Sequence, residues 1–209
     1  MSKMKSIKNE LIEMWSLVHS QLKKSYKALN HFDKDLAREV ILLEERVDSS
    51  EVLINSDCED YFALQSFYPV NIPYLLGVLK TSFQLERIGG VAEEIANYIL
   101  ESDKPFSKEL LSETRIIELF RKTINLSALA LDSFEEENIS FNQLVEQNKQ
   151  EFNNMYQQVN QAIISLLEKD PDNINQIIAL FSISKDLERI ADQIILIPHV
   201  IFYEEIKAA

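Results

Sequence analysis

The strongest constraint on the fold is an internal repeat. Residues 69–88 read PVNIPYLLGVLKTSFQLERI, and residues 171–190 read PDNINQIIALFSISKDLERI. The identical pairs are Pro69/Pro171, Asn71/Asn173, Ile72/Ile174, Ser82/Ser184, Leu85/Leu187, Glu86/Glu188, Arg87/Arg189 and Ile88/Ile190. Chance would give about one match in twenty positions. A repeat this long, displaced by about half the chain, predicts one structural unit built twice.

Long stretches of the chain lack residues that break helices. The 209 residues include only 3 Gly and 5 Pro, and no alternation of apolar and polar residues is long enough for a sheet. A chain of this length can bury a core without disulfides. The single cysteine, Cys58, allows no disulfide within the chain, which fits a reducing cytoplasm. We therefore expect an all-α protein.

The amino-terminal residues and the hydropathy indicate where the protein resides. The first residues, MSKMKSIKNELIEMW, are basic but have no apolar segment before Glu10, so they do not resemble a signal peptide. No run approaches eighteen apolar residues, so we expect no membrane-spanning helix. These features predict a cytoplasmic protein.

The net charge narrows the classes of partner. The formal net charge is −13 at pH 7, which argues against binding to nucleic acid because that function needs a basic surface. An acidic chain suits metal cations or basic protein surfaces as partners. The charge is equally explained by solubility alone.

Six helices are predicted from the apolar spacing. They cover about residues 5–30, 34–67, 73–101, 107–133, 141–169 and 172–206. Asp33 can cap the second helix, and residues 102–105 form a linker between the repeats. Three helices per repeat predict two three-helix bundles in tandem, at residues 1–104 and 105–209, with antiparallel neighbours and pseudo-twofold symmetry.

Each repeat places acidic residues on the predicted apolar face of its third helix. A helical wheel puts Glu188 in the middle of that face, with Asp192 one turn along the same side. In the first repeat Glu86 and Glu93 share one line, and the counterpart of Asp192 is Gly90. A buried carboxylate must be protonated, paired with a cation or bound to a metal.

Other acidic positions could complete a metal site. The second helix carries a column of residues at helical spacing, Glu44, Asp48, Glu51 and Asn55, and the fifth carries Gln147, Glu151, Asn154 and Gln158. Carboxylates from facing helices are how bundle proteins bind iron or manganese. In the alternative interpretation, Arg87 and Arg189 pair with carboxylates across the bundle and the acidic column is solvated.

We find no pattern of a catalytic site. The chain has no Gly-rich phosphate loop and no nucleophile elbow, and His19, His31 and His199 are far apart in the sequence. Cys58 lies on an apolar stripe, which favours a core position. We expect a protein that is not an enzyme.

Several motifs resemble those of the PhoU family of phosphate-uptake regulators. LERIGGVAEEIANYI at residues 85–99 and LERIADQIILIPHVIFY at 187–203 are similar to the paired family signatures. Glu51-x-x-Ile54-Asn55-x-x-Cys58 resembles a helix-two pattern of the family, and residues 65–70 with Leu79-Lys80 resemble the segment before the first signature. The likeness covers about 200 residues.

The resemblance implies a fold, partners and a cofactor. It implies two three-helix bundles and a regulator that is not an enzyme. Its implied partners are the ATPase of the phosphate ABC transporter and the phosphate sensor kinase, so that it meets the membrane only through the transporter. We also expect a homodimer, with the apolar face around Trp15 serving either as core or as dimer contact. Several members bind clusters of iron or other divalent metals through E-x-x-x-D motifs.

The sequence departs from the family at several ligand positions. Only the second signature keeps its glutamate–aspartate pair, because Gly90 replaces the first aspartate. We therefore expect metal at one bundle at most, with the second repeat as the stronger candidate. The candidate ligands are Asp48, Glu51, Glu86 and Glu93 in the first bundle and Glu151, Glu188 and Asp192 in the second. Other hypotheses are a metal-storing or metal-dependent bundle protein and a diverged scaffold without metal.

Overall fold

The computed structural model describes residues 3–64, 72–136 and 141–208; the side chains of residues 64, 141–143, 145, 146 and 198–208 are not described. Its helices are α1 (Lys3–His31), α2 (Lys34–Leu64), α3 (Ile72–Glu101), α4 (Lys108–Thr114), α5 (Ile116–Glu136), α6 (Phe141–Lys169) and α7 (Ile174–Ala208), with a short 3-10 helix, η2, at Pro171–Asn173. No strand occurs in these ranges, which confirms the all-α prediction. The resembling segment at 65–70 and the side chain of His199 lie outside the described residues.

The described ranges contain seven α-helices where the sequence predicted six. The predicted helix at 107–133 is divided at Arg115, whose backbone is left-handed (φ 56°, ψ 24°). A left-handed residue cannot continue a right-handed helix, so α4 ends there and α5 begins at the next residue. Ser107 caps α4 by accepting a hydrogen bond from the Leu110 amide at 3.3 Å.

Other predicted helix boundaries are confirmed. The Asp33 carboxylate accepts hydrogen bonds from the amides of Asp35 and Leu36, both at 3.0 Å, which caps α2. Helix α6 ends at Lys169, before Asp170 and Pro171, as expected. The sequence also suggests that Pro198 kinks or interrupts the last helix; α7 continues through Pro198 without interruption.

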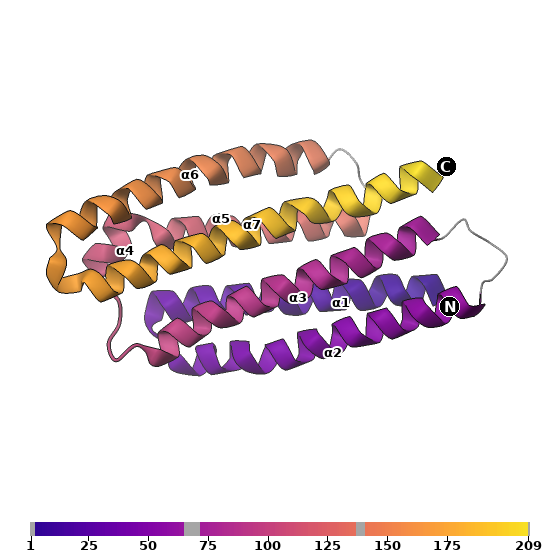
Figure 1. Cartoon of the computed structure of the whole chain (residues 1–209), viewed down its shortest axis with the longest axis horizontal. Helices are drawn as coiled ribbons and strands as arrows, with labels where there is room; N and C mark the ends of the chain where they lie inside the picture. The colour runs from indigo at the N-terminus through magenta and orange to yellow at the C-terminus, as the bar shows by residue number, and fades with distance from the viewer. Residues whose placement is uncertain (1–2, 65–71, 137–140, 209) are drawn as a thin grey trace.

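The helices form two bundles that lie side by side (Figure 1). Helices α1, α2 and α3 pack against one another, as do α5, α6 and α7, while the short α4 packs on α5 and α6. The bundles meet where α3 packs along α7 and α1 packs along α5. Helices α3 and α7 run in opposite directions across the centre of the molecule (Figure 1).

Aromatic side chains join the two bundles between α1 and α5. Trp15 is fully buried, and its ring stacks on Phe134 with a centroid distance of 6.0 Å. Nearer the other end of α1, Tyr26 contacts Phe120 edge to face at 5.8 Å. The apolar face around Trp15 therefore belongs to the core, which decides between the two alternatives left open by the sequence.

One negative result concerns membranes. Among the described residues, none of the helices combines the length and the apolar character needed to cross a bilayer.

The packing between the bundles predicts a large effect of truncating Trp15. We expect Trp15→Ala to lower the free energy of unfolding by about 3–5 kcal/mol, because it empties a fully buried site shared by both bundles. Urea unfolding followed by circular dichroism measures this change. Leu42→Ala is the control, since Leu42 is 60% exposed and its loss should change stability by less than about 0.5 kcal/mol. Equal effects of the two substitutions would contradict the described packing.

Candidate functional site

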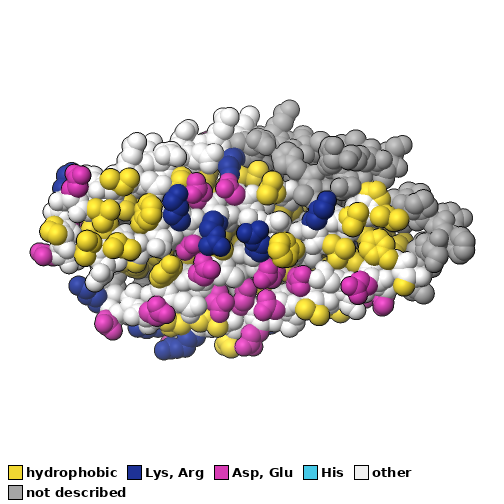
Figure 2. Space-filling model, viewed as in Figure 1, with side chains coloured by type: hydrophobic (Ala, Val, Ile, Leu, Met, Phe, Trp, Pro, Cys, Tyr) yellow, Lys and Arg dark blue, Asp and Glu magenta, His cyan; other side chains and the backbone are white. Residues whose placement is uncertain are grey.

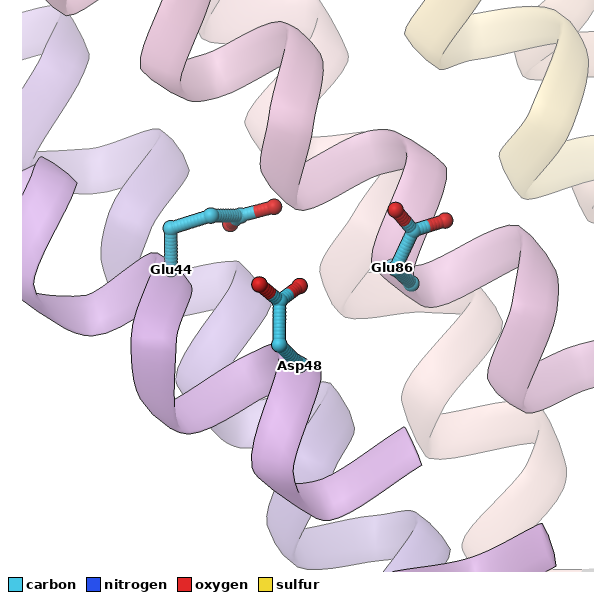
Figure 3. A group of neighbouring side chains, drawn as sticks. All are labelled: Glu44, Asp48 and Glu86. Atoms are coloured by element: carbon cyan, nitrogen blue, oxygen red, sulfur yellow. The ribbon is translucent and has the colours of Figure 1, made fainter. Parts of the chain in front are cut away.

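Three carboxylates converge between α2 and α3 in the first repeat. One oxygen each from Glu44, Asp48 and Glu86 lies within 4.8 Å of the others. Glu44 and Asp48 come from successive turns of α2, and Glu86 points toward them from α3 (Figure 3). We call Glu44, Asp48 and Glu86 the acidic cluster.

Glu44 is the buried member of the acidic cluster. Its side chain is only 7% exposed, whereas Glu86 is half-buried and Asp48 is exposed. The amide Nε2 of fully buried Gln21 on α1 donates to Glu44 Oε2 at 2.6 Å. One charge-assisted hydrogen bond compensates only part of the cost of burying this carboxylate.

Gly89 provides the space that Glu44 occupies. A Cβ atom added at Gly89 would lie 2.5 Å from Glu44 Oε2 and 3.0 Å from Gln21 Oε1. A Cβ at Gly90 would be 3.5 Å from the nearest Glu44 oxygen, which is an ordinary contact. Gly89 therefore lets the Glu44 carboxylate approach the backbone of α3 closely.

Burial and mutual repulsion change the acidity of the cluster. Burial raises the pKa of Glu44 to about 7; the Gln21 hydrogen bond opposes this shift, while Asp48, Glu93 and Glu86 add to it. The pKa of Glu86 is also raised, first by burial and then by Asp48 and Glu51, with Arg87 opposing. The negative charges in this region are thus poorly compensated by the protein itself.

The donor set of the first repeat fits a hard metal cation. Carboxylate oxygens from two facing helices are the ligands that divalent cations and iron take in helical bundles. Gln21 Oε1, which lies beside the cluster, is buried and has no hydrogen-bond partner among the described residues. Glu44, Asp48 and Glu86 would hold the ion. A bound cation would neutralise their repulsion and link α2 to α3.

Two further predicted ligands flank this cluster. Glu51 and Glu93 are half-buried, and both contribute to the electrostatic environment of the cluster. Glu51 accepts a hydrogen bond from the Asn55 amide at 2.6 Å, as their spacing on one helix face allows. Glu51 and Glu93 therefore add negative charge next to the three convergent carboxylates.

The second repeat pairs its candidate ligands with lysines. Lys149 contacts Asp192, Lys122 lies 2.8 Å from Glu151, and Lys185 lies 3.2 Å from Glu188. The hydrogen bond from Lys122 lowers the pKa of Glu151. The structure does not bring Glu188, Asp192 and Glu151 together into one group within its described part. Their charges are compensated by ammonium groups, so this arrangement does not fit a metal.

The prediction that Glu86 and Glu188 lie in the middle of an apolar face is wrong. Both side chains are half-buried, and Asp192 is exposed. The buried residues of α7 include Leu180, Leu187 and Ile194, which lie to one side of Glu188. The third helix of each repeat also packs on the other bundle. Its buried face is therefore centred away from Glu86 or Glu188, the positions that the helical wheel placed in the middle.

Sequence reasoning gave too little weight to Glu44 and overlooked Gln21 and Gly89. Glu44 belongs to the acidic column of the second predicted helix. Its spacing of four residues from Asp48 is the sequence signal that places both carboxylates on one face of that helix. The sequence suggests that Gly90 replaces a ligand, whereas the structure shows that the neighbouring Gly89 accommodates the Glu44 carboxylate from another helix. No spacing within the sequence could reveal that contact.

The comparisons with known proteins agree with this architecture. The PhoU domain model matches residues 11–99 and again residues 116–197. The chain belongs to the PhoU family. Each match lies within one of the bundles and includes that bundle's copy of the repeat.

PhoU relatives match nearly the whole chain. The phosphate-specific transport system accessory protein PhoU of Escherichia coli K12 is 26% identical over 202 residues, which cover 97% of this chain and 83% of the relative. The PhoU homolog of Aquifex aeolicus is 27% identical over 183 residues, covering 87% and 81%.

Solved PhoU structures share the fold. The PhoU of Pseudomonas aeruginosa superposes with a TM-score of 0.87 at 20% identity, covering 100% of this chain and 99% of the other. The regulatory protein PhoU of Streptococcus pneumoniae gives a TM-score of 0.84 at 21% identity, covering 96% and 94%.

The buried Glu44 predicts a contribution to the stability of the metal-free protein that is lost as pH rises. Its folded-state pKa, about 7, lies above the ordinary value of 4.5, so the folded state binds the proton more tightly. The contribution of Glu44 to stability is therefore fully present below pH 4.5 and is lost as the pH rises through 7, by about 1–3 kcal/mol in all. We expect Glu44→Gln to be more stable than the parent at pH 8 by that amount, with little difference at pH 5.

Urea unfolding in EDTA at both pH values measures this effect. Glu59→Gln is the matched control, because Glu59 is an exposed glutamate of the same helix. If Glu44→Gln and the parent show the same dependence on pH, Glu44 is not a buried carboxylate in solution.

Proposed function

We propose that this protein is a cytoplasmic regulator of phosphate uptake and of phosphate-responsive signalling. It acts without catalysis, by binding the ATPase of the phosphate ABC transporter, the phosphate sensor kinase or both. It works as a homodimer and meets the membrane only through the transporter. The observation that carries the proposal is the PhoU domain match in both repeats, together with accessory-protein relatives that align over nearly the whole chain.

The exposed face of α3 and α7 is the surface that we assign to partner binding. Exposed apolar side chains occur at equivalent positions of the two repeats, as the pairs Ile72/Ile174 and Leu76/Ile178. Phe83 on α3 is 50% exposed as well. In Figure 2, hydrophobic side chains gather toward the two ends of this face and charged side chains lie between them. Exposed apolar groups that recur in this way favour a protein contact.

Binding at this face can regulate a partner by changing its conformational balance. A regulator that binds one conformation of an ATPase or kinase more tightly shifts the population toward that conformation. The available shift equals the difference in binding free energy between the two conformations. No covalent chemistry is needed.

Partner capture from phosphate-replete cells tests the regulatory proposal. We expect the tagged protein to recover the transporter ATPase or the sensor kinase, and deletion of its gene to raise phosphate-starvation expression. Replacing Leu76 and Ile178 by glutamate should reduce recovery at least about tenfold, because charges replace apolar contacts at both ends of the face.

Leu42→Glu provides the control for that substitution. Leu42 is an exposed leucine that belongs to α2 and not to α3 or α7. It should leave recovery unchanged. If neither partner is recovered and deletion leaves phosphate-responsive expression unaltered, the regulatory function is refuted.

A second candidate function is metal binding in the first repeat, in a storage or metal-dependent role. The acidic cluster favours it, because three carboxylates converge there and burial raises the pKa of both Glu44 and Glu86, against which Arg87 acts only on Glu86. We infer one iron or divalent metal site per chain, held by Glu44, Asp48 and Glu86. Because the second repeat holds its carboxylates with lysines, it takes no metal.

Metal analysis tests this inference. We expect protein purified without chelator and equilibrated with Fe²⁺ or Mn²⁺ to retain about one metal per chain. Glu44→Gln combined with Glu86→Gln should reduce bound metal at least about tenfold, because two of three anionic ligands are lost. Elemental analysis after dialysis gives the ratio.

Asp192→Asn is the matched control in the second repeat. It removes a predicted ligand that contacts Lys149, so bound metal should not change. Loss of metal in Asp192→Asn but not in the double variant would place the site in the second repeat. Retention of metal by all the variants would show that none of these residues binds it.

A further inference from the structure

A basic groove lies where α4 meets α5. It has a volume of about 720 Å³ and is open to solvent. Asn30 from α1 and Met155 from α6 line it together with residues of α4 and α5. None of its lining residues belongs to the acidic cluster.

The lining of this groove is positive, although the chain as a whole is strongly negative. Its four basic residues face a single carboxylate, Glu118, in the lining; they are Lys108, Arg115, Arg121 and Lys122. The net charge of the whole chain is −13. A local excess of positive charge in such a chain favours an anionic ligand.

Two of the four cations are already held by carboxylates. The Arg115 guanidinium binds Glu118, with Nε at 3.0 Å from Oε2, and donates through Nη1 to Gln158 at 3.1 Å. The Lys122 ammonium lies 2.8 Å from Glu151. These pairs fix the positions of Arg115 and Lys122 along the groove.

The other two cations have no such partner. Arg121 donates through Nη2 to the neutral Tyr26 hydroxyl at 3.2 Å, and Lys108 is exposed. Neither of them has a carboxylate within salt-bridge distance in the parts of the chain that the structure describes. The remaining N–H groups of the Arg121 guanidinium have no described carboxylate within salt-bridge distance, although the charge of Glu118 in the same lining also acts on this group.

The backbone at the junction also suits an anion. Because Arg115 is left-handed, α4 ends and a new helix of 21 residues begins beside the groove. Helix amino termini carry partial positive charge. At this terminus the amides of Glu118 and Leu119 already donate to the Arg115 carbonyl, at 3.0 and 3.2 Å, so the contribution to anion binding is the partial charge of the helix end. Arg115 itself and the α5 residues Ile117 and Glu118 line the groove at this terminus.

The groove combines this charge with an apolar wall. Leu111, Ile117 and Met155 line it and pack on the core, while Ser112 and Asn125 supply neutral hydrogen-bonding groups. Ligand sites for small molecules commonly measure about 300–1,000 Å³ and combine apolar walls with a few polar groups. The volume is large enough for a nucleotide.

We propose that this groove binds the phosphate group of a small molecule of up to nucleotide size. Arg121 and Lys108 contact the phosphate oxygens, since guanidinium and ammonium groups form charge-assisted hydrogen bonds with them. The apolar wall contacts the remainder of the ligand. This anion site is separate from any cation site at the acidic cluster. The proposal does not depend on which regulatory partner the protein binds.

Calorimetric titration of the full chain tests the groove. The probes are inorganic phosphate, AMP, ATP and adenosine, in low salt with EDTA so that metal chelation does not contribute. We expect saturable binding of AMP or ATP, none of adenosine, and weaker binding as salt is raised. Arg121→Gln with Lys108→Gln should weaken binding at least about tenfold. Both residues are exposed, so circular dichroism should show an unchanged fold.

Two control variants separate the groove from other charges. Arg38→Gln removes an exposed cation of α2, and Glu44→Gln alters the acidic cluster; both should leave binding unchanged. Inorganic phosphate that binds as tightly as AMP, and is lost in the double variant, would identify free phosphate as the ligand. No saturable binding of phosphate, AMP or ATP, or equal binding by the double variant, would overturn the proposal.

Discussion

The packing of α3 along α7 is the contact on which the rest of the structure depends. Each of these helices completes its own three-helix bundle and also forms the main contact with the other bundle. Each must therefore bury a wide arc of its surface, and long rows of Ile, Leu, Val and Ala supply it. The carboxylates of Glu86 and Glu188 lie at the edge of that arc, beside the second helix of the same repeat, where water and counterions still reach them.

The two repeats share the same helix arrangement but differ in how the charges of their acidic residues are compensated. In the first, Glu44 is buried beside Asp48 and Glu86 with one amide hydrogen bond, and its pKa rises to about 7. In the second, lysines neutralise the corresponding region. A buried charge without a partner is costly, so the first arrangement favours an external cation or a proton, whereas the second needs neither.

Charge is also distributed unevenly over the rest of the surface. The acidic cluster belongs to α2 and α3, whereas the basic groove belongs mainly to α4 and α5. The apolar positions shared by α3 and α7 belong to neither. These three chemically distinct surfaces suit the cation, the anion and the protein partner that we propose, and each surface can be altered by substitutions that leave the core intact.

The sequence by itself determined the helices, the duplication and the PhoU resemblance. These follow from local spacing: apolar residues recur at helical intervals, Asp33 caps α2, and the second LERI copy repeats the first. Only the tertiary structure decided that Trp15 is core, that Arg115 divides a helix, and that Gly89 makes room for Glu44. It alone paired Lys149 with Asp192. Each of these outcomes depends on which residues of different helices, or of the left-handed turn at Arg115, lie together. Those contacts are set by packing across the whole molecule, because spacing along one helix does not determine which residues of another helix lie opposite.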